Sequence, residues 1–162
     1  MAVSAYEVIA TTTLTTTQNQ VDFNSISGSY TDLVLVMNGG VTSSADVWLR
    51  MNSDTASNYS RTRLYGEGTN TASSRNSASS AIFVSVGAVG SNASMVIQIQ
   101  NYSNSTTYKT SLTRFNSSTY IAASVGLWRS TSAITSLTLK AEAADTFTSG
   151  STFTLYGVKA AA

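Results

Sequence analysis

Residue types that usually carry chemistry are missing or scarce in this chain. Its 162 residues include no cysteine and no histidine, and charged residues make up only 10%. The absence of cysteine excludes a disulfide framework and a thiolate metal site. The absence of histidine removes the commonest general base and the commonest transition-metal ligand. We therefore expect no enzyme, no metal site and no cofactor.

The charge balance is also close to neutral. Nine Lys and Arg residues stand against eight Asp and Glu residues, which gives a net charge of +1. Such a field is too weak to hold a phosphate backbone, so we expect no nucleic-acid partner. No apolar run approaches the length of a membrane span, and residues 1–7 lack the basic and apolar regions of a signal peptide. We therefore expect no membrane partner and no secretion signal.

Alternation of apolar and polar residues runs through the chain, and no segment keeps a helical period. The pattern predicts about ten short strands with turn signals roughly every dozen residues. Residues 32–38 are apolar on both alternations, which is typical of a central strand. We predict an all-β chain with a single domain over residues 1–162, an antiparallel, jelly-roll-like β-sandwich. An immunoglobulin-like sandwich is the alternative.

Three segments define the expected topology. Residues 122–139 alternate on both sides of a short polar break, which predicts a hairpin of two half-buried strands that seeds the fold. Val125 and Leu127 would face the core, and Ser124 and Gly126 would face a neighbouring subunit. Residues 66–80 are rich in Ser, Asn and Gly, which predicts a long functional or interfacial loop. A further strand is expected over residues 81–87.

Carboxylates are the first place to look for catalysis or metal binding. Asp54 and Glu67 flank the expected strand over residues 59–65 and could form an acid and base pair of the glycosidase kind. Asn52, Asp54 and Asn58 could offer oxygens to calcium, but their spacing lacks the central glycine and the terminal bidentate acid of a calcium loop. We favour solvated loop carboxylates in both cases.

An alternating run of arginine and tyrosine is the best candidate for an interface. Tyr59, Arg61, Arg63 and Tyr65 share one face of a strand, and guanidinium groups beside phenol rings grip carboxylates, carbonyls or sugars. An exposed sheet face without a partner is the alternative interpretation. The full set of candidate interface residues is Trp48, Tyr59, Arg61, Arg63, Tyr65, Trp128 and Arg129.

Five stretches in chain order resemble the landmarks of a known family. They are SYTDLVLV at residues 29–36, NYSRTRLYG at 58–66, NYSN at 101–104, ASVGLWRSTSAI at 123–134 and GSTFTLYGVK at 150–159. Together they resemble a family of small virion structural proteins encoded by tailed bacteriophages. Ser27 and Gly28 stand where the family pattern has Pro-Gly.

The resemblance implies a structural component of a phage particle and transfers no catalytic residue. Fibre proteins usually carry a coiled coil or a repetitive shaft, and this sequence shows neither pattern. We therefore expect a capsid decoration (cement) protein on the outer capsid surface of the virion, bound to the major capsid protein. A homotrimer is expected because icosahedral lattices present three-fold positions.

The alternative is a tail or fibre-associated module that binds a receptor or a host surface glycan. In this hypothesis Trp48, Tyr65 and Trp128 are the surfaces on which sugar rings stack.

Overall fold

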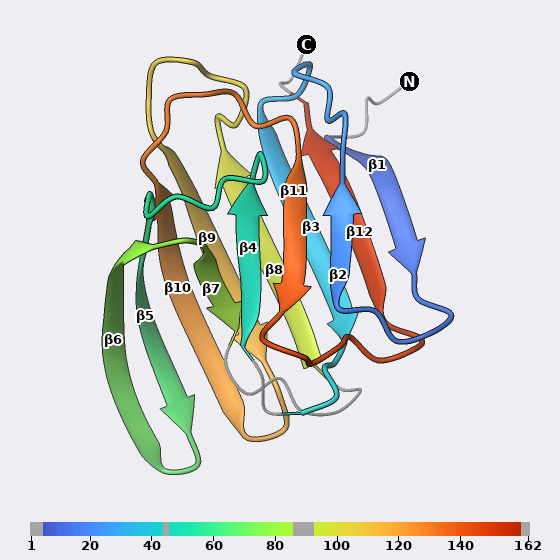
Figure 1. Cartoon of the computed structure of the whole chain (residues 1–162), viewed down its shortest axis with the longest axis vertical. Coiled ribbons are helices and arrows are strands. Elements are labelled where there is room, and N and C mark those ends of the chain that lie inside the picture. The colour runs from blue at the N-terminus through green and yellow to red at the C-terminus, as the bar shows by residue number, and fades with distance from the viewer. Residues whose placement is uncertain (1–4, 44–45, 86–92, 160–162) are drawn as a thin grey trace.

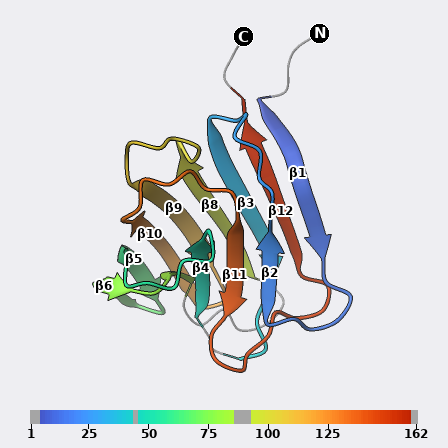
Figure 2. The same cartoon turned by 45° about the horizontal axis from the view of Figure 1, so that its top comes forward.

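The chain forms two antiparallel sheets that face each other. The computed structural model describes residues 5–43, 46–85 and 93–159, which hold twelve strands and no helix. No helix in these residues is long and apolar enough to cross a membrane. Figures 1 and 2 show the smaller sheet lying over part of the larger one. The predicted all-β, jelly-roll-like sandwich is confirmed.

The larger sheet has eight strands. In spatial order they are β1 (Tyr6–Thr13), β12 (Thr152–Val158), β3 (Asp32–Gly39), β8 (Ala93–Gln100), β9 (Lys109–Asn116), β10 (Tyr120–Trp128), β5 (Tyr59–Glu67) and β6 (Asn70–Ser79). The smaller sheet has four strands: β2 (Gln20–Phe23), β11 (Leu137–Ala141), β4 (Val47–Met51) and β7 (Ile82–Ser85). This division into eight and four strands differs from the immunoglobulin arrangement.

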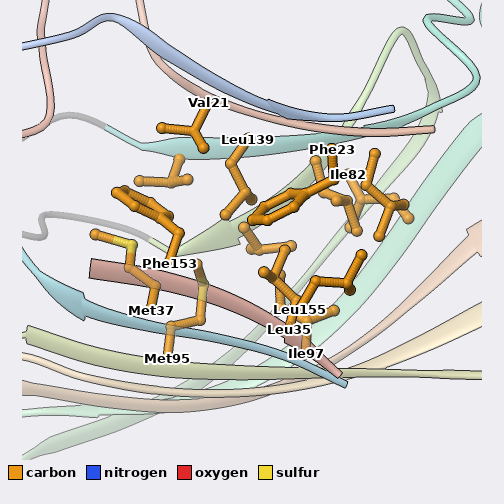
Figure 3. Packing of buried hydrophobic residues seen from close by; sticks show 14 of the residues in the cluster. Val21, Phe23, Leu35, Met37, Ile82, Met95, Ile97, Leu139, Phe153 and Leu155 are labelled. Atoms are coloured by element: carbon orange, nitrogen blue, oxygen red, sulfur yellow. The ribbon is translucent and has the colours of Figure 1, made fainter. Parts of the chain in front are cut away.

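The hydrophobic core lies between the two sheets. Side chains that alternate along each strand point inward from both layers, as Figure 3 shows. Each fully buried aliphatic or aromatic side chain contributes about 1.5–3 kcal/mol relative to an exposed one. The labelled members are Val21, Phe23, Leu35, Met37, Ile82, Met95, Ile97, Leu139, Phe153 and Leu155. Strand β3 lies between β12 and β8, so the predicted central strand is confirmed.

The predicted hairpin over residues 122–139 is wrong. Strand β10 pairs with β5 and β9 in the larger sheet, whereas β11 pairs with β2 and β4 in the smaller sheet. The polar break therefore carries the chain from one layer of the sandwich to the other. Alternation identifies each strand and its two faces, but it carries no information about which strand lies alongside.

The orientation predicted for β10 is also reversed. Ser124, Gly126 and Trp128 point into the sandwich, while Val125 is 53% exposed on the opposite face. Gly126 is required there because a Cβ atom would lie 2.6 Å from Ser111 Oγ and 2.7 Å from Ile82 Cδ1. The close approach that we expected from a neighbouring subunit comes instead from β9 and β7 of the same chain.

The predicted loop over residues 66–80 is a strand for most of its length. β5 and β6 form a hairpin whose two-residue connection begins at Gly68, with a φ of +57°. Positive φ at this position is typical of the tight turns that join antiparallel strands. The hairpin extends past the smaller sheet (Figure 1), so most of β6 is exposed. Of the strand expected over residues 81–87, β7 covers Ile82–Ser85, and residues 86 and 87 lie outside the described residues.

Trp128 is a core residue, and its removal should therefore lower stability. Its ring is 2% exposed and stacks on Tyr59 with ring centroids 6.2 Å apart. We expect Trp128→Ala to lower the free energy of unfolding by about 3–5 kcal/mol, measured by chemical denaturation. The exposed neighbour Val125→Ala is the control and should change it by less than about 0.5 kcal/mol. A Trp128→Ala protein with unchanged stability and an altered oligomeric state would contradict the assignment to the core.

Candidate functional site

The candidate site is the outer face of the eight-stranded sheet, which is the face turned away from the smaller sheet. Cross-strand partners share a face, so the register defines it row by row. One outward row runs through Val8, Tyr156, Val34, Gln98, Leu112 and Val125. The neighbouring inward row runs through Leu155, Leu35, Ile97, Thr113, Ser124 and Arg63. The outward row is largely apolar, and neither sheet formed by the described residues lies over it.

Large exposed apolar side chains gather on this outer face. Among the described residues, six of the seven that are strongly exposed belong to it, and the seventh, Tyr108, precedes β9. Ile121 is 66% exposed and Leu64 is 65% exposed. The other four are Tyr6, Val8, Leu112 and Val125. Contiguous apolar patches of this kind on a folded chain usually mark a surface that binds a partner.

The outer face is hollowed at two places. The larger hollow has a volume of about 990 Å³ and is lined by residues of β5, β6, β8, β9 and β10, including Leu64, Val96 and Ile121. The smaller one has a volume of about 340 Å³ and is lined by residues that include Tyr6, Val34 and Leu112. A shallow concave surface of this sort fits a convex partner better than a flat one.

Few charges interrupt the outer face. Within the described strands, the register places three charged side chains on it: Asp32, Arg75 and Arg114. Asp32 is already engaged, because its Oδ1 accepts a hydrogen bond from the backbone N–H of Asn101 at 2.7 Å. Contacts made by this face must therefore rely on apolar side chains and neutral hydrogen bonds more than on ion pairs.

Two of the candidate interface residues, Tyr59 and Trp128, belong to a hydrogen-bonded cluster with Asp54 and Asn58 at the beginning of β5, which we call the Asp54 cluster. The Trp128 Nε1–H donates to Asp54 Oδ2 at 2.7 Å, and the Asn58 Nδ2–H donates to the same oxygen at 2.9 Å. The Tyr59 hydroxyl donates to backbone carbonyls of Met51 and Asp54 at 3.2 Å. Burial raises the pKa of Tyr59 to about 12, so the phenol stays protonated and keeps donating.

The other candidates line the inner side of the sheet or the outside of the smaller one. Arg61 is 7% exposed, and Arg63 lies over the ring of Tyr65 at 4.5 Å. Arg129 donates from Nη2 to the carbonyls of Ser57 and Tyr59 at 3.1 and 3.3 Å. Trp48 is half-buried on β4. Its ring meets the edge of Phe83, and the Arg50 guanidinium lies over it at 5.6 Å.

The carboxylates considered for catalysis or calcium are not arranged for either. Asp54 lies before β5 and Glu67 at its far end, so at about 3.3 Å per residue they are about 25 Å apart, well beyond the spacing of a glycosidase pair. Asn52 Oδ1 accepts hydrogen bonds from the backbone N–H groups of Thr135 and Ser136. No group of three or more metal-ligating side chains occurs in the part of the chain that the structure describes.

The sequence pattern did not reveal the outer face, and it led us to place Val125 and Leu127, which lie on that face, in the core. Ile121, Val125 and Leu112 have the aliphatic, alternating character of core residues. The sequence of β10 does distinguish the two faces: one set of alternate residues is aliphatic, and the other set includes Tyr120, Ser124 and Trp128. Either set of side chains could be buried. Only the three-dimensional structure shows that there are too few strands to cover both faces of the larger sheet.

The fold and this surface together define an all-β sandwich with an uncovered apolar face. No family model matches the chain, and no curated protein matches it. The galectin LEC-6 of Caenorhabditis elegans is similar with a TM-score of 0.39 and 12% identity, over 89% of this chain and 94% of the galectin. A human SPRY domain is similar with a TM-score of 0.23 and 7% identity, over 94% of this chain and 99% of the domain. Neither likeness bears on the function of this chain.

The Asp54 cluster makes the stability of the protein depend on pH. Burial opposes ionisation of Asp54, but hydrogen bonds from Asn58, Trp128 and the Ala56 backbone outweigh it and hold the pKa below the usual 3.8. A depressed pKa contributes stability that is present above the unfolded value and is lost as the pH falls through the folded value. We therefore expect the free energy of unfolding to fall as the pH drops below about 4.

The Asp54→Asn variant tests this dependence. Trp128 and Asn58 donate to one carboxylate oxygen of Asp54, and the Ala56 backbone N–H donates to the other. Because asparagine has a single acceptor oxygen and no negative charge, it cannot accept on both sides, and we expect a loss of about 1–2 kcal/mol at neutral pH. Denaturation curves at several pH values should also show a smaller decrease between neutral and acidic pH than in the unsubstituted protein. Identical pH profiles for the two proteins would contradict the role of Asp54.

Proposed function

We propose that the chain is a structural protein of a tailed-bacteriophage virion, a capsid decoration protein that binds the outer capsid surface. The observation that carries the proposal is the uncovered, apolar and charge-poor outer face of the eight-stranded sheet. In this proposal the outer face lies against the major capsid protein. The polar Ser- and Thr-rich remainder of the molecule faces solvent.

The position of the sequence landmarks supports the same face. Four of the five stretches that resemble the phage family fall on strands β3, β5, β10 and β12, and all four strands belong to the larger sheet. The fifth, at residues 101–104, directly follows β8 of that sheet. The stretches that carry the resemblance therefore build the sheet that presents the apolar face.

Self-association is part of the proposal. The larger sheet ends in β1 on one side and in β6 on the other. β6 is ten residues long and exposed along most of its length, and Arg75 is its only charged residue. An edge strand without protecting charges offers unpaired backbone groups to another strand. We propose that copies of this chain meet at these edges in a homotrimer around three-fold positions of the capsid.

The alternative function is a tail or fibre-associated module that binds a receptor or glycan. Of its three proposed stacking residues, Trp128 is buried and Tyr65 stacks on Tyr120 with ring centroids 5.2 Å apart. Trp48 is half-buried, and Arg50 lies over its ring. The absence of an open aromatic platform among these three residues makes decoration the better-supported function.

The location of the protein in the particle separates the two functions. We expect a density map of the intact virion to show this sandwich on the outside of the head, in groups of three, with the outer face of the larger sheet against the capsid. Density for the sandwich at the tail tip would contradict the decoration function and favour the glycan-binding module.

The outer face is tested by substitution at its most exposed aliphatic residue. We expect Ile121→Ser to weaken binding to purified heads that lack the protein by about ten- to a hundredfold, the equivalent of about 1.5–3 kcal/mol for one buried aliphatic side chain. Tyr108→Ser removes a similarly exposed apolar side chain from the segment before β9, which is not part of the paired rows of the outer face, and should leave binding unchanged. Thermal unfolding should show that both variants are folded, because both side chains already lie in solvent.

Salt dependence gives a second readout of the same contact. Since the outer face carries few charges, added sodium chloride should change the affinity for heads by less than about threefold. Strong weakening in moderate salt, or equal loss of binding in the Ile121 and Tyr108 variants, would contradict an apolar contact through this face.

A further inference from the structure

Two cations of the β5 strand lack a counter-ion inside the sandwich. The Arg61 guanidinium donates from Nη1 to the Phe83 carbonyl at 3.2 Å and from Nη2 to Asn76 Oδ1 at 2.7 Å, and Arg63 Nε–H donates to Ser74 Oγ at 2.8 Å. These three acceptors are neutral. Among the described residues, no carboxylate lies within ion-pair distance of either arginine. Buried charges in folded proteins are normally paired, so this arrangement is incomplete without an anion.

Each arginine also keeps a buried donor without a partner. Arg61 Nε and Arg63 Nη1 are inaccessible to solvent and make no hydrogen bond. A buried donor left unsatisfied costs about 1–3 kcal/mol, and more when it is charged. Two such donors on adjacent inward positions of one strand are difficult to explain as a purely structural feature.

Three buried hydroxyl groups without partners lie on the strands next to β5. Ser124 lies directly opposite Arg63 on β10, and Thr113 lies directly opposite Ser124 on β9. The side-chain oxygens of both are buried and unpartnered, and so is the hydroxyl of Tyr120. Arg63 lies over the Tyr120 ring at 5.9 Å, which places this phenol in the same cluster. We call these five residues, Arg61, Arg63, Thr113, Tyr120 and Ser124, the inner corner.

The local charge of the inner corner is positive. Asp46 interacts electrostatically with both arginines, and it forms no ion pair with either among the described residues. Burial and then the nearby Glu142 raise the pKa of Asp46, and Arg61 and Arg63 act in the opposite direction. Burial and then the neighbouring Arg63 lower the pKa of Arg61, as expected for two like charges without an anion between them.

We propose that the inner corner binds a small oxyanion, held by Arg61 Nε, Arg63 Nη1 and the hydroxyl groups of Thr113, Tyr120 and Ser124. Guanidinium groups donate to oxyanions through short, charge-assisted hydrogen bonds, and hydroxyl groups complete the shell. The site lies on the covered side of the sheet, where Arg61 donates to the carbonyl of Phe83 on the edge strand β7. It is separate from the outer face and does not depend on the decoration function.

A crystallographic experiment locates the anion directly. Crystals of the full chain, grown without sulfate or phosphate, are soaked in low-millimolar selenate, and anomalous scattering is recorded at the selenium edge. A peak between Arg61 Nε and Arg63 Nη1 is the expected result. Ordered water in the inner corner with no peak, or peaks only beside exposed arginines and lysines, meaning an adventitious ion only, would overturn the proposal.

Calorimetry in solution tests the chemistry and the residues. Titrations with sulfate, acetate and chloride at constant ionic strength should show binding of sulfate or acetate and none of chloride, and the preferred anion distinguishes a tetrahedral from a carboxylate ligand. Equal binding of chloride, or no binding of either oxyanion, would overturn the proposal.

Matched variants attribute the binding to the inner corner. We expect Arg63→Gln to weaken it by about ten- to a hundredfold, because a hydrogen bond to a charged group is lost. Arg75→Gln on β6 is the control, since it removes the same charge from an exposed position of the same hairpin, and it should bind as the unsubstituted chain does. If Arg63→Gln does not fold, Ser124→Ala removes one hydroxyl and should weaken binding by a smaller factor; unchanged affinity in Ser124→Ala and equal loss in Arg75→Gln would each count against the site.

Discussion

Four strands cover part of one face of an eight-stranded sheet, and the remaining features of the molecule follow from this difference in size between the two sheets. Where the smaller sheet lies over the larger one, aliphatic side chains from both layers form the core (Figure 3). On the far side of the larger sheet the described residues form no second layer, and several aliphatic residues stay exposed there. Because apolar side chains left in water forgo the stabilisation of burial, such a surface is usually kept for a partner.

The smaller size of the four-stranded sheet also explains why polar residues occupy the inner face near β5 and β6. Strand β7 is the last strand of the smaller sheet on this side, and the hairpin of β5 and β6 extends past it (Figure 1). Beyond β7 there are too few aliphatic side chains to build a core, and arginine, tyrosine and hydroxyl residues occupy the inward positions instead. The Arg63 guanidinium lies over the rings of Tyr65 and Tyr120, where a cation is attracted to the faces of both aromatic rings.

The Asp54 cluster takes the place of aliphatic packing at the beginning of β5. Asp54, Asn58 and Trp128 are joined by hydrogen bonds, and the Tyr59 ring stacks on Trp128. The Tyr59 hydroxyl also donates a hydrogen bond to the backbone carbonyl of Met51 on β4, so the Asp54 cluster connects the two sheets. The carboxylate considered for calcium or catalysis thereby has a structural role in this loop.

The sequence by itself determined the all-β class, the positions of most strands and the near-neutral charge, because these depend on local alternation and composition. It predicted the central position of β3, since that strand is apolar on both faces. The tertiary structure alone decided that residues 122–139 divide between two sheets, that β6 is a strand, and that Val125 faces outward and Trp128 inward. Alternation specifies that a strand has two faces, whereas the covering of a face depends on which distant strands pair and how many remain to lie above it. For the same reason the outer face and the inner corner could not be predicted, since each is assembled from strands far apart in the chain.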